Sequence, residues 1–432
     1  MGNKADNGKT ECNKIKHGEA KDEKKVPKLR FPEFTDEWEE RKLGEVGTTY
    51  SGLSGKTKEN FGHGNGQFVT YMNVFTNPVG LPEMTEAIEI DDSQNEVRFG
   101  DVFFTTSSET PEEVGMSSVW LENVNNTYLN SFCFGYRPTV EFNPYYLAYM
   151  LRSSSLRDKI TFLAQGISRY NISKNKMMDI EIPIPNIKEQ KEIGSFFHTL
   201  DRFITRHQQK LEHLEDLKKG MLQKMFPKEG ETVPEVRFPG FTGKWERRKL
   251  GEISYKVKEK NTELKYLETF TNSAEFGVIS QMDFFDHNIS KKEKLDDYYV
   301  VHNDDFVYNP RISATAPVGP INRNKLGRSG VMSPLYMVFR SHDIDTGYLE
   351  YFFRSTYWHY YMFFYGDSGA RSDRFSIKDN VFMDMPIPFP EITEQKKIGR
   401  FFSELDDFVT LHKHRLEHLK ELKKGLLQQM FV

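Results

Sequence analysis

Apolar side chains recur with a seven-residue period in two long segments of the chain. In each segment they occupy two positions of the heptad, which predicts an α-helix whose apolar seam packs against another helix. At about 1.5 Å per residue, a helix of about 40 residues spans roughly 60 Å, so we expect two spacer helices. The predicted seam consists of Ile193, Phe197, Leu200, Ile204, His207, Leu211 and Leu214, repeated as Ile398, Phe402, Leu405, Val409, His412, Leu416 and Leu419.

The two helices belong to a larger internal repeat. Pro27 to Val46 matches Pro234 to Ile253 at 13 of 20 positions, and Ile182 to Phe226 matches Ile387 to Phe431 at 28 of 45 positions. Dissimilar stretches separate the matched blocks, so the chain alternates variable domain and helix twice.

These blocks set the expected boundaries. We expect domains over 27–185 and 234–390, helices over 186–226 and 391–432, and a linker over 227–233. The polar segment 1–26, rich in lysine, is predicted to be disordered.

Each helix needs a partner for its seam, and the other copy in the same chain is the nearest one. Packed antiparallel, the helices would relate the two domains by an approximate twofold axis. Duplex DNA has dyads normal to its axis, so domains related in this way can meet its grooves in equivalent geometry. Because the loops of the copies differ, the predicted target is a split, asymmetric sequence.

Composition narrows the class of protein and its compartment. The chain has 432 residues, of which 37% are hydrophobic and 14% aromatic, and this content is sufficient to form hydrophobic cores. The two cysteines, Cys12 and Cys133, cannot form a disulfide framework. No apolar run reaches the length of a membrane span or a signal-peptide core, which favours a cytoplasmic protein without a membrane partner.

Charge disfavours strong DNA binding by this chain alone. The net charge is −4; residues 27–185 carry 14 Lys and Arg against 22 Asp and Glu, and residues 234–390 carry 21 of each. Binding to duplex DNA is stronger when cationic side chains neutralise its phosphates. An acidic domain must therefore concentrate its cations on one face. We therefore expect weak binding without partners.

Candidate DNA contacts lie in loops that differ between the copies. The polar stretch 51–66 is longer in the first copy, and a solvated loop is an equally good interpretation of each lysine in either copy. The run from Thr105 to Ser108 aligns with Asn309 to Ile312, so equivalent positions would read different bases. Arg169-Tyr170 aligns with Arg374-Phe375, which suggests a shared phosphate contact or an arginine packed on its own domain. The full set is Lys56, Lys58, His63, Asn65, Thr105, Thr106, Ser107, Ser108, Arg169, Tyr170, Lys256, Lys258, Lys260, Asn309, Arg311, Ser313, Arg371 and Arg374.

The repeated motifs resemble those of specificity subunits of type I restriction-modification enzymes. Trp38 with Arg41-Lys42-Leu43-Gly44, and Trp245 with Arg248-Lys249-Leu250-Gly251, open the two domains. A proline pair followed by Glu-Gln closes each domain, within Ile180 to Asp201 and within Met385 to Asp406. The resemblance covers nearly the whole chain from Pro27 to Phe431.

The resemblance implies a mixed α/β fold, with two target-recognition domains joined and spaced by two long antiparallel coiled-coil helices. It implies that each domain reads half of a bipartite site in double-stranded DNA and that this chain carries no catalysis and no cofactor. The implied partners are two methyltransferase subunits that use S-adenosylmethionine and two restriction subunits that use ATP and Mg²⁺.

Two other classes of function compete with this one. A coiled-coil scaffold could bring proteins together without reading DNA, and apolar patches on both domains would favour it. A self-contained methyltransferase lacks its motif, because Asn143-Pro144-Tyr145 and Asn309-Pro310-Arg311 have no second proline. The glycine-rich Phe61 to Gly66 is predicted to be a surface loop, since no strand precedes it and no helix follows.

Glutamates at the helix starts and histidines in the seam are expected to have structural roles. Glu189 and Glu394 could belong to a nuclease site, but glutamate in the first turn of a helix complements the helix dipole. His207 and His412 lie in the seam, where polar residues more often fix register than bind metal. No metal site is predicted.

Overall fold

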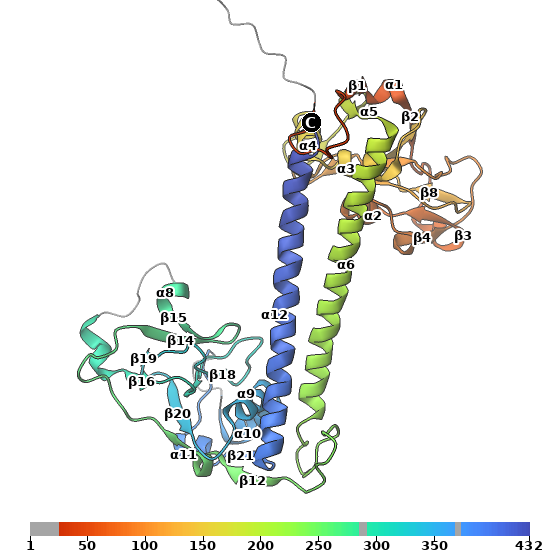
Figure 1. Cartoon of the computed structure of the whole chain (residues 1–432). Coiled ribbons are helices and arrows are strands. Elements are labelled where there is room, and N and C mark those ends of the chain that lie inside the picture. The colour runs from red at the N-terminus through yellow and green to blue at the C-terminus, as the bar shows by residue number, and fades with distance from the viewer. Residues whose placement is uncertain (1–25, 285–291, 368–372) are drawn as a thin grey trace, which may run out of the picture. The chain divides into compact units, whose positions relative to one another are not determined.

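The computed structural model describes residues 26–284, 292–367 and 373–432. They form two compact units (Figure 1): the first contains residues up to Thr205 with Glu417–Val432, and the second contains Arg206–Leu416. Each unit thus combines one globular domain with parts of both long helices. Apart from Val26, the tail expected over 1–26 lies outside the described residues, as does the candidate contact Arg371.

The first domain contains two larger sheets. One has the strand order β2-β9-β5-β7 and is antiparallel; the other has the order β4-β3-β8, with β3 and β8 parallel. The strands are β2 (Gly47–Ser51), β3 (Phe61–Val69), β4 (Thr85–Ile88), β5 (Val102–Thr105), β6 (Ser107–Ser108), β7 (Ser117–Val119), β8 (Thr127–Leu129), β9 (Cys133–Pro138) and β10 (Tyr170–Asn171). The helices are α1 (Leu43–Val46), α2 (Tyr71–Thr76), α3 (Pro144–Met150), α4 (Ser154–Phe162) and α5 (Lys174–Met178), with short 3-10 turns over 58–60, 82–84 and 111–113.

The second domain repeats this plan. Its sheets have the orders β13-β20-β17-β18 and β15-β14-β19-β16, and β14 and β19 are again parallel. The strands are β13 (Ser254–Lys256), β14 (Thr269–Ser273), β15 (Gly277–Ser280), β16 (Tyr299–Val301), β17 (Phe306–Tyr308), β18 (Ile321–Arg323), β19 (Gly330–Met332) and β20 (Met337–Ser341). The helices are α7 (Leu250–Ile253), α8 (Gln281–Phe284), α9 (Thr346–Arg354), α10 (Tyr357–Tyr365) and α11 (Asp379–Met383), with a 3-10 turn over 292–297. The expected mixed α/β fold with two similar domains is confirmed.

One local prediction was wrong. Phe61 to Gly66 was expected to be a surface loop, but it forms the first part of β3 and pairs irregularly with β4. Gly64 has a φ of 101°, and a Cβ there would lie 2.5 Å from the Ile88 carbonyl oxygen. The glycines therefore serve close backbone approach in an irregular strand pair.

The motifs that open and close each domain pair with each other. β1 (Glu39–Lys42) pairs with β11 (Glu181–Ile184), and β12 (Glu246–Lys249) pairs with β21 (Pro386–Phe389), both antiparallel. The last strand of each pair leads directly into a long helix. This pairing brings the start of the domain to the start of its helix.

The long helices are α6 (Ile187–Lys224) and α12 (Ile392–Gln429). In the first unit Phe197 stacks on Phe431, and in the second unit Phe226 stacks on Phe402, so the helices run antiparallel in each unit (Figure 1). Among the described residues, no helix combines the length and apolar character that crossing a membrane requires. The buried seam residues are Ile193, Phe197, Leu200, Leu211, Leu214, Ile398, Phe402, Leu405 and Leu416, and the other five, Ile204, His207, Val409, His412 and Leu419, are partly buried.

A buried carboxylate fixes each domain to its helix. In the first unit Glu189 is fully buried and accepts hydrogen bonds from Arg30 Nε at 2.6 Å and Nη2 at 2.8 Å. The indole of Trp38 donates a further bond to it at 3.2 Å. The hydrogen bonds with Glu189 raise the pKa of the Arg30 guanidinium.

The second unit repeats this contact. Glu394 is fully buried and accepts from Arg237 Nε at 2.6 Å, from Arg237 Nη2 at 2.7 Å and from Trp245 Nε1 at 3.1 Å. Bidentate arginine pairing of this kind is both strong and directional. We call each set of three residues an Arg-Glu-Trp lock; it holds the opening segment of a domain against the first turn of its helix.

Two histidines meet in the seam of the second unit. His207 and His412 occupy equivalent repeat positions, and their Nδ1 atoms lie 2.9 Å apart. This distance fits a hydrogen bond in which one neutral ring donates and the other accepts. Burial, the neighbouring His207 and the charges of Arg415 and Lys210 all lower the pKa of His412.

We expect acid to weaken the seam at this pair. Because the pKa of His412 is lower in the folded protein, the unfolded chain binds the proton more tightly, and stability is lost as the pH falls below about 6.5. Thermal melts between pH 7.5 and pH 5 should show a smaller loss of stability for the double variant His207→Asn with His412→Asn than for the wild type, because two asparagines cannot titrate. Parallel pH curves for the wild type and this variant would contradict the expectation.

Candidate nucleic-acid interface

Two segments predicted to contact DNA lie side by side in each domain. In the first domain, β6 pairs with β10, which sets Ser107 against Asn171. In the second domain, Arg311 and Arg374 form an antiparallel bridge. We call these pairs the reading edges. The same place in the two domains therefore carries a serine and an amide in one copy and two guanidinium groups in the other.

The reading edge of the second domain borders a groove. This groove has a volume of about 330 Å³ and brings together residues distant in the sequence, including Lys256, Pro310 and Arg374. Tyr336 and Leu335, which sequence reasoning missed, also line it, and Lys256 forms an ion pair with Asp379 there. Cationic and aromatic side chains around one hollow can meet both phosphates and base faces.

The structure corrects the prediction that the hydroxyl run Thr105 to Ser108 of the first domain contacts bases. Thr105, Ser107 and Ser108 are buried. Thr105 ends the central strand β5, whose side chains are all buried, and the two serines form β6, which pairs with β10. The hydroxyl of Thr105 accepts from the Met116 amide at 3.0 Å. Thr106 is partly buried and donates to the Phe132 carbonyl at 2.8 Å. These hydroxyls are occupied within the domain, and the exposed side chain at this reading edge is that of Asn171.

The structure also corrects the sequence alignment of Arg169 with Arg374. Ile172 N donates to the Thr106 carbonyl, and Phe375 N donates in the same way to the Pro310 carbonyl. The structural equivalent of Arg374 is therefore Asn171 and not Arg169. Arg169 is exposed, and Tyr170 is partly buried opposite Ser108.

The other candidates of the first domain lie on and beside β3. Lys56 is largely buried and pairs with Asp91 at 2.7 Å, which lowers the pKa of that carboxyl. Lys58, His63 and Asn65 are exposed, and His63 Nε2 lies 2.8 Å from the Glu59 carbonyl oxygen. Lys56 is thus neutralised by its own domain, whereas the other three remain accessible.

The remaining candidates of the second domain divide in the same way. Lys260 pairs with Asp297 at 2.6 Å, and Asn309 donates to the Asn272 carbonyl at 2.8 Å. Lys258 and Ser313 are exposed. Among the described candidates of the second domain, Lys258, Arg311 and Arg374 are exposed cations for which no carboxylate partner is found.

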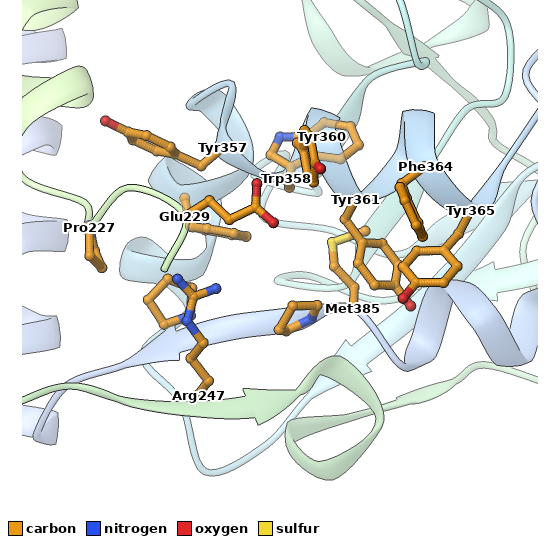
Figure 2. Close-up of a pocket in the computed structure, with 13 residues that line it drawn as sticks. Pro227, Glu229, Arg247, Tyr357, Trp358, Tyr360, Tyr361, Phe364, Tyr365 and Met385 are labelled. Atoms are coloured by element: carbon orange, nitrogen blue, oxygen red, sulfur yellow. The ribbon is translucent and has the colours of Figure 1, made fainter. Parts of the chain in front are cut away.

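A second hollow of about 310 Å³ is lined mainly by aromatic side chains of α10 (Figure 2). Tyr360, Phe364 and Tyr365 are each more than half exposed, and Arg247 of β12 also lines the hollow. α10 carries no Lys or Arg, whereas its counterpart α4 carries Arg157 and Lys159. No residue predicted to bind DNA lines this hollow.

The comparisons with known proteins decide the family. Residues 35–216 and 242–421 each match the family model described as the type I restriction modification DNA specificity domain. The chain belongs to this type I DNA specificity family. The two matched segments contain both reading edges and most of both long helices.

Relatives of the type I specificity family match over most of the chain. The protein assigned as the MjaX specificity subunit of Methanocaldococcus jannaschii is 23% identical over 439 residues, covering 95% of this chain and 96% of the relative. The MjaVIII specificity subunit of the same organism is 25% identical over 302 residues, covering 64% and 68%. The solved S subunit of the type I restriction-modification system from M. genitalium shares the fold at a TM-score of 0.57 and 14% identity, covering 94% of this chain and 99% of that one. The predicted family is confirmed, and the scaffold alternative is not favoured.

Proposed function

We propose that this type I specificity subunit reads an asymmetric, bipartite site in double-stranded DNA, one half-site per domain. The observation that carries the proposal is the contrast between the two reading edges, where Asn171 occupies the place of Arg374. Arginine pairs well with the guanine edge in the major groove, and asparagine pairs with adenine. Two edges of one fold with different chemistry support two different half-sites.

The chain supplies sequence recognition and no catalysis. In this proposal two methyltransferase subunits, which use S-adenosylmethionine, join it, and two restriction subunits, which use ATP and Mg²⁺, complete a complex in the cytoplasm. The Arg-Glu-Trp locks support this role, because a domain that is fixed to its helix presents its reading edge in one orientation.

The isolated chain is expected to bind DNA weakly. Residues 27–185 carry eight more acidic than basic residues by the counts given above, so the phosphate clamp must come largely from the partners. Binding measured with and without a methyltransferase subunit, at two salt concentrations, tests this. Nanomolar, site-specific binding by the purified single chain would contradict the proposal.

A further inference from the structure

Each domain presents one exposed apolar side chain beside its reading edge. Phe132 lies in the turn between β8 and β9 and is 58% exposed, and Leu335 lies in the turn between β19 and β20 and is 61% exposed. Single exposed apolar residues are common on protein surfaces, so exposure alone indicates no function. The positions of these two residues in their domains are informative.

Phe132 and Leu335 occupy equivalent positions of the domain repeat. In each domain a buried aspartate just before a central strand, β5 or β17, forms an ion pair with an arginine near the turn. These pairs are Asp101 with Arg137, and Asp305 with Arg340. Each exposed apolar residue lies five residues before the arginine of its own pair. The surrounding loops differ between the copies, but this position is apolar and exposed in both.

In the first domain the backbone places Phe132 directly beside the reading edge. Thr106 donates to the Phe132 carbonyl twice, from its amide at 3.0 Å and from its hydroxyl at 2.8 Å. The carbonyl of Thr106 in turn accepts from the amide of Ile172, the residue after Asn171. The segments that carry Phe132 and Asn171 are therefore both hydrogen-bonded to Thr106.

In the second domain Leu335 and Arg374 line one groove. A side chain also fixes the turn in each domain: Asn130 Oδ1 accepts from the Phe132 amide at 2.9 Å, and Ser333 Oγ accepts from the Leu335 amide at 3.4 Å. Side chains of this kind stabilise a turn by bonding to the backbone two residues later. Each apolar side chain is thus held next to groups that can form hydrogen bonds with base edges.

The group of duplex DNA that fits an apolar side chain at such an edge is the methyl group of thymine. All four bases present hydrogen-bonding atoms in the major groove, and thymine alone adds a C5 methyl group. Contact between that methyl group and an apolar side chain removes apolar surface from water, which favours thymine over cytosine at the same position.

We propose that Phe132 and Leu335 are specificity-determining residues, each of which contacts the methyl group of a thymine in the half-site read by its domain. This inference rests on the proposed function, because it requires that each domain reads one half-site. Asn171 in the first domain, and Arg311 with Arg374 in the second, supply the hydrogen bonds to neighbouring base edges.

Deoxyuridine tests the proposal, because it differs from thymidine only in lacking the methyl group. The complex of this chain with its methyltransferase subunit is titrated with duplexes of the motif that it methylates, in which one thymine at a time is replaced. One replacement in each half-site is expected to weaken binding by the wild-type complex about fourfold, the effect of losing one buried methyl group. Phe132→Ala should abolish this sensitivity in one half-site only, and Leu335→Ala should abolish it in the other half-site only.

Phe99→Ala and Leu267→Ala are matched controls. Both residues are more than half exposed. Phe99 precedes β5, at the end of that strand opposite Thr105, and Leu267 precedes β14 and does not line the groove at the reading edge. Both control variants should respond to deoxyuridine as the wild type does, and circular dichroism melts verify that each variant is folded.

The outcomes separate this proposal from the proposed function. A complex that binds no split motif would reject the proposed function, and the methyl contact with it. Binding of a split motif that no deoxyuridine replacement weakens, or a half-site without thymine, would reject the methyl contact alone. Alanine variants that keep the sensitivity of the wild type would also reject it, and a general loss of affinity in them would show that the side chains contact DNA without reading the methyl group.

Discussion

Glu189→Gln is expected to lower the free energy of unfolding of the first unit by about 3 kcal/mol, because breaking a buried ion pair leaves an uncompensated charge. The glutamate is fully buried, and Arg30 is only 12% exposed, so water replaces little of the lost interaction. Glutamine has only one acceptor oxygen, and its amide nitrogen is a donor, so it cannot hold the guanidinium with two oxygens.

The repeat supplies an internal comparison for this prediction. Glu394→Gln should destabilise the second unit by a similar amount, because Arg237 and Trp245 make the same contacts. Urea titration followed by tryptophan fluorescence measures both changes, since Trp38 and Trp245 lie in the two locks.

Exposed glutamates on the same helices serve as controls. Glu192→Gln and Glu404→Gln should change stability by less than about 0.5 kcal/mol, as surface substitutions usually do. If Glu189→Gln unfolded at the same urea concentration as Glu192→Gln, the lock would not hold the domain to its helix.

Arg311→Ala with Arg374→Ala is expected to change recognition of one half-site only. A well-placed arginine contact to a base contributes about 1–3 kcal/mol of discrimination, so the complex should lose roughly ten- to a hundredfold preference at the affected positions. Competition binding of the complex with DNAs that vary one half-site at a time measures this.

The control for this variant is Arg328→Ala. Arg328 pairs with Glu268 at 2.7 Å and does not line the groove at the reading edge. A different result would show that Arg311 and Arg374 contact phosphates and do not read bases. It is a uniform loss of affinity across all sequences, together with a slope of log binding constant against log salt concentration that is smaller by about one.

The order of domains and helices could be predicted from the sequence because the chain contains an internal repeat of that order. Heptad spacing and repeated blocks identify helices and domains without any knowledge of packing, and the helices run over 187–224 and 392–429. The locks were missed, since Glu189 was assigned only a helix-dipole role. A signal was present: Arg30, Trp38 and Glu189 all recur in the second copy, as Arg237, Trp245 and Glu394.

The reading edges were predicted only in part. Thr105 to Ser108 were predicted to contact bases, but Thr105, Ser107 and Ser108 are buried, and a short hydroxyl-rich segment carries no periodicity that shows this burial. The pairing of Arg169 with Arg374 failed because the loops before them differ in length between the copies. Only the backbone hydrogen bonds of Ile172 and Phe375 fix that register.

Mapping of N6-methyladenine in host DNA, after co-expression of this chain with a methyltransferase subunit, tests the central claim most directly. The account predicts a split, asymmetric motif. It also predicts that replacing the segment between β1 and β11 with that of another specificity subunit changes one half of the motif and leaves the other half intact. A continuous or palindromic motif, a change in both halves, or an unmodified genome despite a verified complex would contradict it.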